Sequence, residues 1–288
     1  MGNRGRARWA TGVALVLALA GCGSSGLGPL ETTPPPPSAT PASFDPSFTT
    51  EVFSPVAVPS RPTVPMVVLV PGGGWQSHDS SSLVPLAQAI SDAGYYAATT
   101  EYRAGYDGMG FPDSLQDVLC SAAYAVAQVS TSDPAPGPVI LVGHSAGGHL
   151  VALAGVSGTA LARPCTDPIP EIAGVVGLAG IYDATAFQPM MADWFGTPRA
   201  EDPALWDSGD PTHYVSSGAA PATLHVLLIH GDADDVVPLS QSAGFAADLE
   251  KAGIPVQLEV LPGETHRSVI AVGIVADPIL AWLRTWAP

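Results

Sequence analysis

The sequence predicts an α/β protein with a mostly parallel central sheet covered by helices on both faces. Short apolar runs rich in β-branched residues alternate along the chain with longer helical patterns, and no segment is repeated. The apolar runs lack the polar alternation of a half-exposed strand, and uninterrupted apolar strands joined by helices are typical of a parallel sheet buried on both sides. Ligands of such sheets bind beyond the carboxyl ends of the strands.

The individual elements follow from these runs. Strands are expected at Met66–Val70, Tyr95–Thr100, Val139–Val142, Val175–Leu178, His225–Ile229 and Val256–Leu261. Helices are expected at Leu83–Ala93, Ser114–Val129, Ala146–Val156 and Ser240–Ala252.

Composition narrows the class of protein. Of the 288 residues, 47% are hydrophobic and 12% are charged, which favours a globular domain with a buried core. The formal net charge of −16 repels phosphate backbones, and no basic stripe offsets that repulsion locally. Nucleic acid is therefore excluded as an expected partner, and the plainest interpretation of the acidity is that it aids solubility.

The chain opens with the layout of an export signal. Arg4, Arg6 and Arg8 precede an uncharged run over residues 9–20, and small residues follow. A permanent membrane helix needs about 20 apolar residues, so this run is short for one. We expect residues 1–21 to be a signal peptide.

The end of that signal, Leu19-Ala20-Gly21-Cys22, resembles the bacterial lipobox. The resemblance implies that Cys22 is diacylated and anchors an exported lipoprotein to the outer face of a membrane; the alternative is an ordinary signal peptide with a nearby cysteine. Residues 22–45 contain four consecutive prolines and few bulky apolar residues, which indicates an extended tether. Residues 46–288 are then the folded domain.

Two other cysteines, Cys120 and Cys165, remain. They form an even pair in an exported protein, where disulfides persist. A disulfide and two separate buried thiols both fit, because a bridge requires Cα atoms within about 7 Å, which spacing does not reveal.

The strongest chemical signal is a serine flanked by glycines. The run Gly143-His144-Ser145-Ala146-Gly147 follows an expected strand directly and leads into an expected helix. This is the pattern of a nucleophile elbow, in which glycines relieve crowding at a strained turn and the hydroxyl projects from the sheet. Ser145 is therefore the expected nucleophile.

Ser145 needs a base and an orienting carboxylate, which in elbow enzymes follow the serine in the order acid, then histidine. His266 lies just past the last expected strand and is the expected base. Three aspartates crowd the preceding strand end, in His230-Gly231-Asp232-Ala233-Asp234-Asp235. This segment resembles the HGxxDxxVP pattern of many α/β-hydrolases, which places the acid at Asp234, with Asp232 as the alternative.

An oxyanion hole requires backbone amides beside the nucleophile. Ala146 directly follows Ser145 and supplies one amide. The first core strand leads into Pro71-Gly72-Gly73-Gly74-Trp75, here called the glycine loop, where glycines let the backbone approach a substrate closely. A purely structural glycine-rich turn is the alternative interpretation.

Together these motifs resemble the esterase branch of the α/β-hydrolases, including hormone-sensitive-lipase-like and small feruloyl or acyl-ester esterases. GHSAGGHL is especially close, and the likeness extends over residues 66–266. The resemblance implies the α/β-hydrolase fold, Gly73 and Gly74 as oxyanion donors beside Ala146, and no metal or organic cofactor. One departure is Pro71, where many relatives have histidine, so the support of the glycine loop must differ.

The resemblance implies a small-molecule ester as substrate and an acyl-enzyme on Ser145. Trp75 and Tyr182 are expected to contact the substrate, whereas Trp194 and Phe195 fit a pocket wall and core packing equally. Residues 179–224 leave no room for a large lid, which favours a short-chain or exposed acyl ester. The alternatives are an exopeptidase and a surface lipoprotein that binds without catalysis.

Overall fold

The computed structural model describes residues 45–56 and 62–286. The predicted signal peptide (1–21), the lipidation site Cys22 and nearly all of the tether (22–45) lie outside the described residues and stay predictions. None of the helices in the described residues is long and apolar enough to cross a bilayer.

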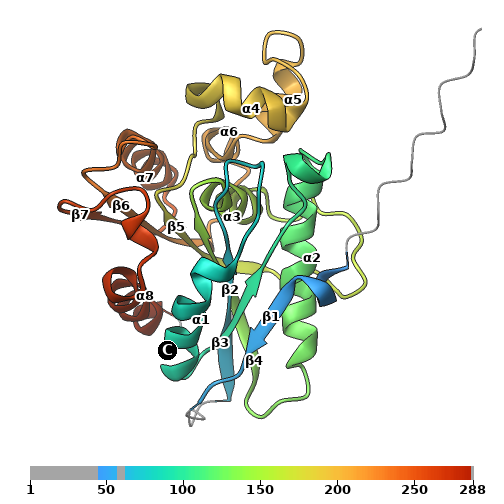
Figure 1. The fold of residues 1–288 in the computed structure, drawn as a ribbon, viewed down its shortest axis with the longest axis vertical. Helices are drawn as coiled ribbons and strands as arrows, with labels where there is room; N and C mark the ends of the chain where they lie inside the picture. The colour runs from blue at the N-terminus through green and yellow to red at the C-terminus, as the bar shows by residue number, and fades with distance from the viewer. Residues whose placement is uncertain (1–44, 57–61, 287–288) are drawn as a thin grey trace, which may run out of the picture. The chain divides into compact units, whose positions relative to one another are not determined.

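A single sheet of mostly parallel strands forms the centre of the described domain (Figure 1). Its strands are β1 (Thr50–Phe53), β2 (Thr63–Val70), β3 (Tyr96–Thr100), β4 (Ala135–His144), β5 (Ile172–Leu178), β6 (His225–Gly231) and β7 (Val256–Leu261). Their order across the sheet is β1-β3-β2-β4-β5-β6-β7. Only the edge strand β1 runs antiparallel to its neighbour, whereas every other pair in the described sheet is parallel. The predicted α/β fold with a mostly parallel sheet is confirmed.

The helices join the parallel strands and close both faces of the sheet. They are α1 (Val84–Asp92), α2 (Asp113–Gln128), α3 (Ala146–Ser157), α4 (Gln188–Phe195), α5 (Pro203–Ser208), α6 (Pro211–Ser216), α7 (Ser240–Ala252) and α8 (Val272–Trp286). Short 3-10 helices lie at Pro46–Phe48, Ser81–Leu83, Gly105–Asp107, Ala184–Phe187 and Ser268–Ile270. All ten strands and helices expected from the sequence are present, within a few residues of their predicted bounds.

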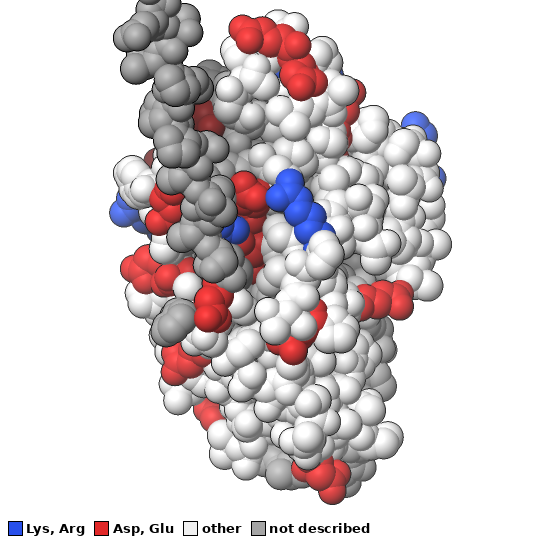
Figure 2. Space-filling view, turned by 90° about the vertical axis from the view of Figure 1, so that its right-hand side faces the viewer, with Lys and Arg blue, Asp and Glu red and all other residues white. Residues whose placement is uncertain are grey.

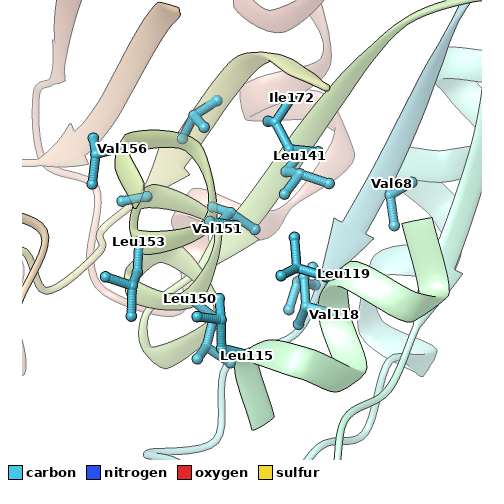
Figure 3. Packing of buried hydrophobic residues seen from close by; sticks show 14 of the residues in the cluster. Val68, Leu115, Val118, Leu119, Leu141, Leu150, Val151, Leu153, Val156 and Ile172 are labelled. Carbon is cyan, nitrogen blue, oxygen red and sulfur yellow. The ribbon is translucent and has the colours of Figure 1, made fainter. Parts of the chain in front are cut away.

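The core consists of two apolar layers, one on each face of the sheet. Met66 and Val68 of β2 point into the layer built with α2, α3 and α7, whereas Val67 and Leu69 point into the layer built with α1 and α8. This alternation follows from the two-residue period of a strand. Figure 3 shows the first layer from nearby, with side chains of α2 and α3 packed against β2 and β4. Truncating a fully buried residue such as Leu141 should destabilise the fold by about 2–5 kcal/mol.

Two features lie at the end of the domain that carries the site residues predicted from the sequence. Strands β4, β6 and β7 end at the same edge of the sheet, because they are parallel and in register. The short helices α4, α5 and α6, here called the cap segment (residues 188–216), lie together at one end of the described domain (Figure 1). Met190 of this segment lies beside Gly74, so the cap segment covers part of the glycine loop.

Surface charge is mostly negative. Figure 2 shows acidic side chains scattered over the face that includes α2, with few lysines or arginines between them. Cys120 of α2 and Cys165, in the loop after α3, are joined by a disulfide with a Cα–Cα distance of 5.4 Å. Of the two arrangements open from the sequence, the structure therefore has the bridge.

Candidate active site

Ser145 lies at a tight turn between β4 and α3. Its backbone has φ 53° and ψ −118°, a conformation that non-glycine residues rarely adopt and that is typical of a strained functional position. A Cβ at Gly143 would collide with the carbonyl of Gly147, and a Cβ at Gly147 would collide with the carbonyls of Val70 and Pro71. The glycines of the motif thus allow β2, β4 and α3 to converge beneath the serine.

The hydroxyl of Ser145 is paired with the predicted base. Nε2 of His266 lies 2.9 Å from Oγ of Ser145, and Nδ1 of the same ring lies 2.8 Å from Oδ2 of Asp234. Ser145 and His266 are only 8% and 7% exposed, so the pair is largely shielded from bulk water yet reachable. The three residues that the sequence singled out are therefore adjacent, in the order nucleophile, base and carboxylate.

Asp234 is held as a carboxylate by its surroundings. Burial alone raises its pKa, but the amides of Val237 and Val236 and the ring of His266 stabilise the charged form and lower the pKa below its usual value. Oδ1 accepts both amide hydrogen bonds, at 2.8 and 2.9 Å. Oδ2 stays directed at His266, which fixes the proton of that ring on Nδ1 and leaves Nε2 as the acceptor for the serine hydroxyl.

The competing aspartate, Asp232, has a different role. Its Oδ1 accepts a hydrogen bond of 2.6 Å from the amide of Gly263, in the loop after β7. Asp232 therefore ties the loop that carries His266 to the end of β6 but does not contact the imidazole of His266.

The glycine loop lies against the elbow. A Cβ at Gly72 would come within 3.1 Å of Cβ of Ser145. Gly73 and Gly74 have φ values of 136° and 61°, and the described residues offer no hydrogen-bond acceptor to their amides or to that of Ala146. Free amides in such a loop, beside a serine and at the start of a helix, are suited to an anion.

The glycine loop has Pro71 where many relatives have histidine, and its support comes from other residues. Backbone bonds run from Gln76 N–H to the carbonyl of Gly73 and from Gly105 N–H to the carbonyl of Trp75, at 3.0 and 2.8 Å. The imidazole of His78 then spans Glu101 and Asp107, with 3.1 Å to each carboxylate. The glycine loop is thus braced by the segment that follows β3.

The expected substrate contacts of Trp75 and Tyr182 are wrong. Both side chains are fully buried and face the core instead of an accessible pocket. The positive φ of Trp75, 58°, turns its indole beneath the loop toward His149 and Trp194. Tyr182 stacks on Phe245 of α7, with 4.5 Å between ring centroids.

Trp194 and Phe195, which the sequence left open, are 2% and 6% exposed and belong mainly to the core. They also border a cavity of about 520 Å³ between the cap segment and the loop after β3, lined in addition by Gln76, Gly110 and Asp193. Ser145 and His266 do not line this cavity, so it lies beside the candidate reaction site.

Three further histidines of the site were not assigned a role from the sequence. Nε2 of His144 lies 2.8 Å from the carbonyl of His266, and the two rings are 4.7 Å apart. Burial and the neighbouring His266 lower the pKa of His144 to about 4. His149 and His230, in contrast to the partly buried His144, are fully buried. For His230, the spacing of four residues to Asp234 was the available sequence signal; the other two depend on contacts between distant segments.

Comparison with known proteins places the chain in a family. The BD-FAE family model matches residues 52–249. The probable carboxylic ester hydrolase LipM of Mycobacterium tuberculosis is 27% identical over 220 residues, which are 71% of this chain and 49% of LipM. Esterase LipC of the same organism is 29% identical over 239 residues, 77% of this chain and 57% of LipC. The chain thus spans about half the length of these curated relatives.

Among solved structures, the acetyl ester-xyloside bifunctional hydrolase of Caldicellulosiruptor lactoaceticus is similar to this chain, with a TM-score of 0.67 and 23% identity. The likeness covers 86% of this chain and 93% of that one, and it shows a shared fold. Because the family match extends over more than half of the sequence, this protein belongs to the BD-FAE family and has the α/β-hydrolase fold.

Proposed function

We propose that this protein is a serine hydrolase that cleaves carboxylic esters through an acyl-enzyme on Ser145. The observation that carries the proposal is the hydrogen-bonded chain from Oγ of Ser145 through His266 to Asp234 at a strained elbow. The relatives LipM and LipC are named as an ester hydrolase and an esterase, which supports the same reaction class.

The reaction follows from the positions of these groups. Oγ of Ser145 attacks the ester carbonyl while Nε2 of His266 takes the hydroxyl proton, and Asp234 stabilises the resulting imidazolium without becoming protonated. The carbonyl oxygen becomes an oxyanion that accepts hydrogen bonds from the amides of Gly73, Gly74 and Ala146. His266 then gives its proton to the departing alcohol, which leaves the acyl group on Ser145.

The second half returns the enzyme to its starting state. Water attacks the acyl carbon as His266 removes a water proton, a second oxyanion forms in the same place, and the bond to Oγ breaks. His266 returns that proton to Oγ, and the carboxylic acid leaves. Each oxyanion donor of this kind contributes about 3 kcal/mol to the barrier reduction.

The acyl group we propose is short. Ser145 is largely shielded, and Met190 of the cap segment stands beside Gly74, 42% exposed, where it narrows the space above the glycine loop. A side chain at this place leaves less room for a long acyl chain than for an acetyl or butyryl group.

The test is hydrolysis of p-nitrophenyl esters from acetate to laurate by the wild type and by Ser145→Ala, with parallel labelling by a fluorophosphonate. We expect activity on the short esters and labelling of the wild type, both lost in Ser145→Ala. Activity that persists in Ser145→Ala would contradict the mechanism. Cleavage of aminoacyl amides in preference to esters would favour the exopeptidase alternative, and a folded wild type that neither hydrolyses nor labels would favour a binding module.

We further propose that the domain is exported and anchored through Cys22. The layout of residues 1–22 and the disulfide between Cys120 and Cys165 support an oxidising, extracytoplasmic location. Cys22→Ala should release the full chain from the membrane fraction, and mass spectrometry of the mature N-terminus should find a diacylated cysteine. An unmodified N-terminus at another residue would contradict the anchor.

A further inference from the structure

His149 is a buried polar residue one turn beyond the nucleophile, and the proposed reaction does not consume it. It belongs to α3, where its amide bonds to the carbonyl of Ser145 at 3.0 Å. Its side chain is fully buried, and both ring nitrogens have partners: Nε2 lies 2.9 Å from the carbonyl of Gly209, and Nδ1 lies 3.3 Å from Nε1 of Trp75. One imidazole therefore joins the nucleophile helix, the cap segment and the glycine loop.

The partners fix the proton of this ring. The carbonyl of Gly209 can only accept, so Nε2 of His149 carries the hydrogen, and the indole of Trp75 can only donate, so Nδ1 offers a lone pair. Burial lowers the pKa of His149 to about 4, which keeps the ring neutral at physiological pH. A neutral ring in this one tautomer satisfies both bonds. A protonated ring would instead direct an N–H at Nδ1 toward the indole N–H of Trp75.

Trp75 is the residue through which His149 reaches the glycine loop. It directly follows Gly74 and has φ 58°, a value that L side chains rarely adopt and that persists only when the surroundings impose it. The imposing contacts are the bond to His149, the edge-on ring of His149 at 5.2 Å and the ring of Trp194 at 5.8 Å. The indole anchor thus fixes the backbone directly after Gly73 and Gly74, in the loop that lies against Ser145 at Gly72.

The cap segment is fastened to the same imidazole. The ring of Trp194 meets His149 edge-on at 5.0 Å, and Gly209 accepts the proton of Nε2. A Cβ at Gly209 would come within 2.5 Å of the ring of Phe195, so this carbonyl can approach His149 only because the residue is glycine.

We propose that His149 is a positioning residue for the oxyanion hole: its neutral imidazole holds the indole of Trp75, and thereby the amides of Gly73 and Gly74, where they receive the oxyanion. The inference rests on the proposed esterase function. It separates from that function in the experiment, because it concerns the rate of acylation and not the identity of the nucleophile.

Two substitutions divide the two bonds of His149. In His149→Asn, Oδ1 takes the place of Nδ1 and can still accept from Trp75, whereas the bond to Gly209 is lost. In His149→Gln, Nε2 takes the place of the ring Nε2 and can still donate to Gly209, whereas Trp75 loses its acceptor. With p-nitrophenyl acetate, we expect kcat of His149→Gln to fall about 10- to 100-fold with KM within about threefold, because small displacements of oriented groups cost rate. His149→Asn should recover most of that loss.

A second substitution, Trp75→Phe, removes the indole N–H instead. It should lower kcat as His149→Gln does. The double variant Trp75→Phe/His149→Gln should be no slower than the slower single variant, because both substitutions remove the same bond. The matched control is Trp206→Phe, because Trp206 is also a buried tryptophan and its Nε1 donates to the carbonyl of Thr197 at 2.9 Å, outside the glycine loop. Trp206→Phe should lower Tm and leave kcat unchanged.

The outcomes that overturn the proposal are distinct. Wild-type kcat in Trp75→Phe, or equal losses in His149→Asn and His149→Gln, would show that His149 does not act through the indole of Trp75. A wild type that hydrolyses no ester and takes no fluorophosphonate would overturn the proposed function, and this inference with it, before any variant is compared.

Discussion

Nε2 of His230 lies 3.3 Å from Oδ2 of Asp234, the carboxylate oxygen that also pairs with His266. The same Nε2 donates to the carbonyl of Val237 at 2.9 Å, which fixes its hydrogen, and Nδ1 lies 2.7 Å from Oγ of Ser242, whose hydroxyl is then the donor. The carboxylate of Asp234 therefore lies against a neutral, buried histidine whose N–H is directed at the carbonyl of Val237.

This arrangement predicts a role for His230 in orienting Asp234. His230→Leu removes the polar contact with Oδ2 of Asp234 and leaves the buried carbonyl of Val237 unpaired, so we expect kcat to fall about tenfold and the free energy of unfolding to fall by about 1–3 kcal/mol. His230→Gln keeps a donor near the position of Nε2 and should retain most of the activity. Esterase assays and urea unfolding of both variants check this, and equal kcat values for the two would contradict the orienting role.

Two of the three aspartates after β6, Asp232 and Asp234, offer a matched pair of substitutions. Asp234→Asn replaces the acceptor of the His266 proton and should stabilise the wrong tautomer of the ring, so we expect kcat to fall by about 10⁴-fold. Asp232→Asn keeps an oxygen for the amide of Gly263 and should change kcat less than about threefold. Steady-state kinetics of both variants on one ester decide the assignment, and the reverse order of effects would move the acid to Asp232.

Much of the fold was predictable because its signals are local. The apolar strand runs and the helix after Ser145 carry the pattern of a buried parallel sheet in their own residues. The edge strand β1 was missed, because its four residues are partly exposed and follow a proline-rich stretch. The helix α8 was missed as well, although Val275, Ile279 and Leu283 place a buried stripe along it, because Pro278 interrupts the pattern.

The residues of the site likewise divide into those with a local sequence signal and those that depend on contacts between distant segments. The sequence singled out Ser145 and His266 because each lies shortly after an expected strand, in the chain order of elbow enzymes, and it favoured Asp234 over Asp232 through the likeness to the HGxxDxxVP pattern. The substrate contacts expected of Trp75 and Tyr182 were wrong because composition does not reveal where a side chain points. The bond between His149 and Gly209 joins residues 60 positions apart, and no local pattern encodes it.

Buried histidines predict that the protein loses stability in mild acid. The pKa values of His144 and His149 fall from 6.5 to about 4 on folding, mainly through burial, so the unfolded chain binds more protons between these values. The free energy of unfolding should therefore be largest above pH 6.5 and decline toward pH 4, on the order of 3 kcal/mol for each ring. The pKa values of Asp117 and Asp210 are raised by burial, which opposes this decline only below their own native pKa values.

Urea unfolding at a series of pH values between 4 and 7.5 measures this slope. His144→Asn removes one of the two rings and should flatten the decline. Identical slopes for the variant and the wild type would show that His144 is not held neutral by the fold.

The disulfide between Cys120 and Cys165 predicts a separation of stability from activity. It closes a sequence separation of 45 residues between α2 and the loop after α3, which in the chain-entropy account stabilises the fold by about 4 kcal/mol. Cys120→Ala/Cys165→Ala should therefore lower the free energy of unfolding by roughly 2–5 kcal/mol, within the usual range for a lost disulfide. Polar contacts of the two sulfur atoms are made by Gln116 and by the carbonyl of Arg163, and neither residue has a hydrogen bond to Ser145 or His266 among the described residues. We therefore expect the double variant to keep the wild-type kcat at room temperature and to unfold at a lower urea concentration.

The wild type treated with dithiothreitol gives the contrary outcome. If Cys120 and Cys165 titrate as free thiols but the urea midpoint is unchanged, the bridge does not stabilise the fold.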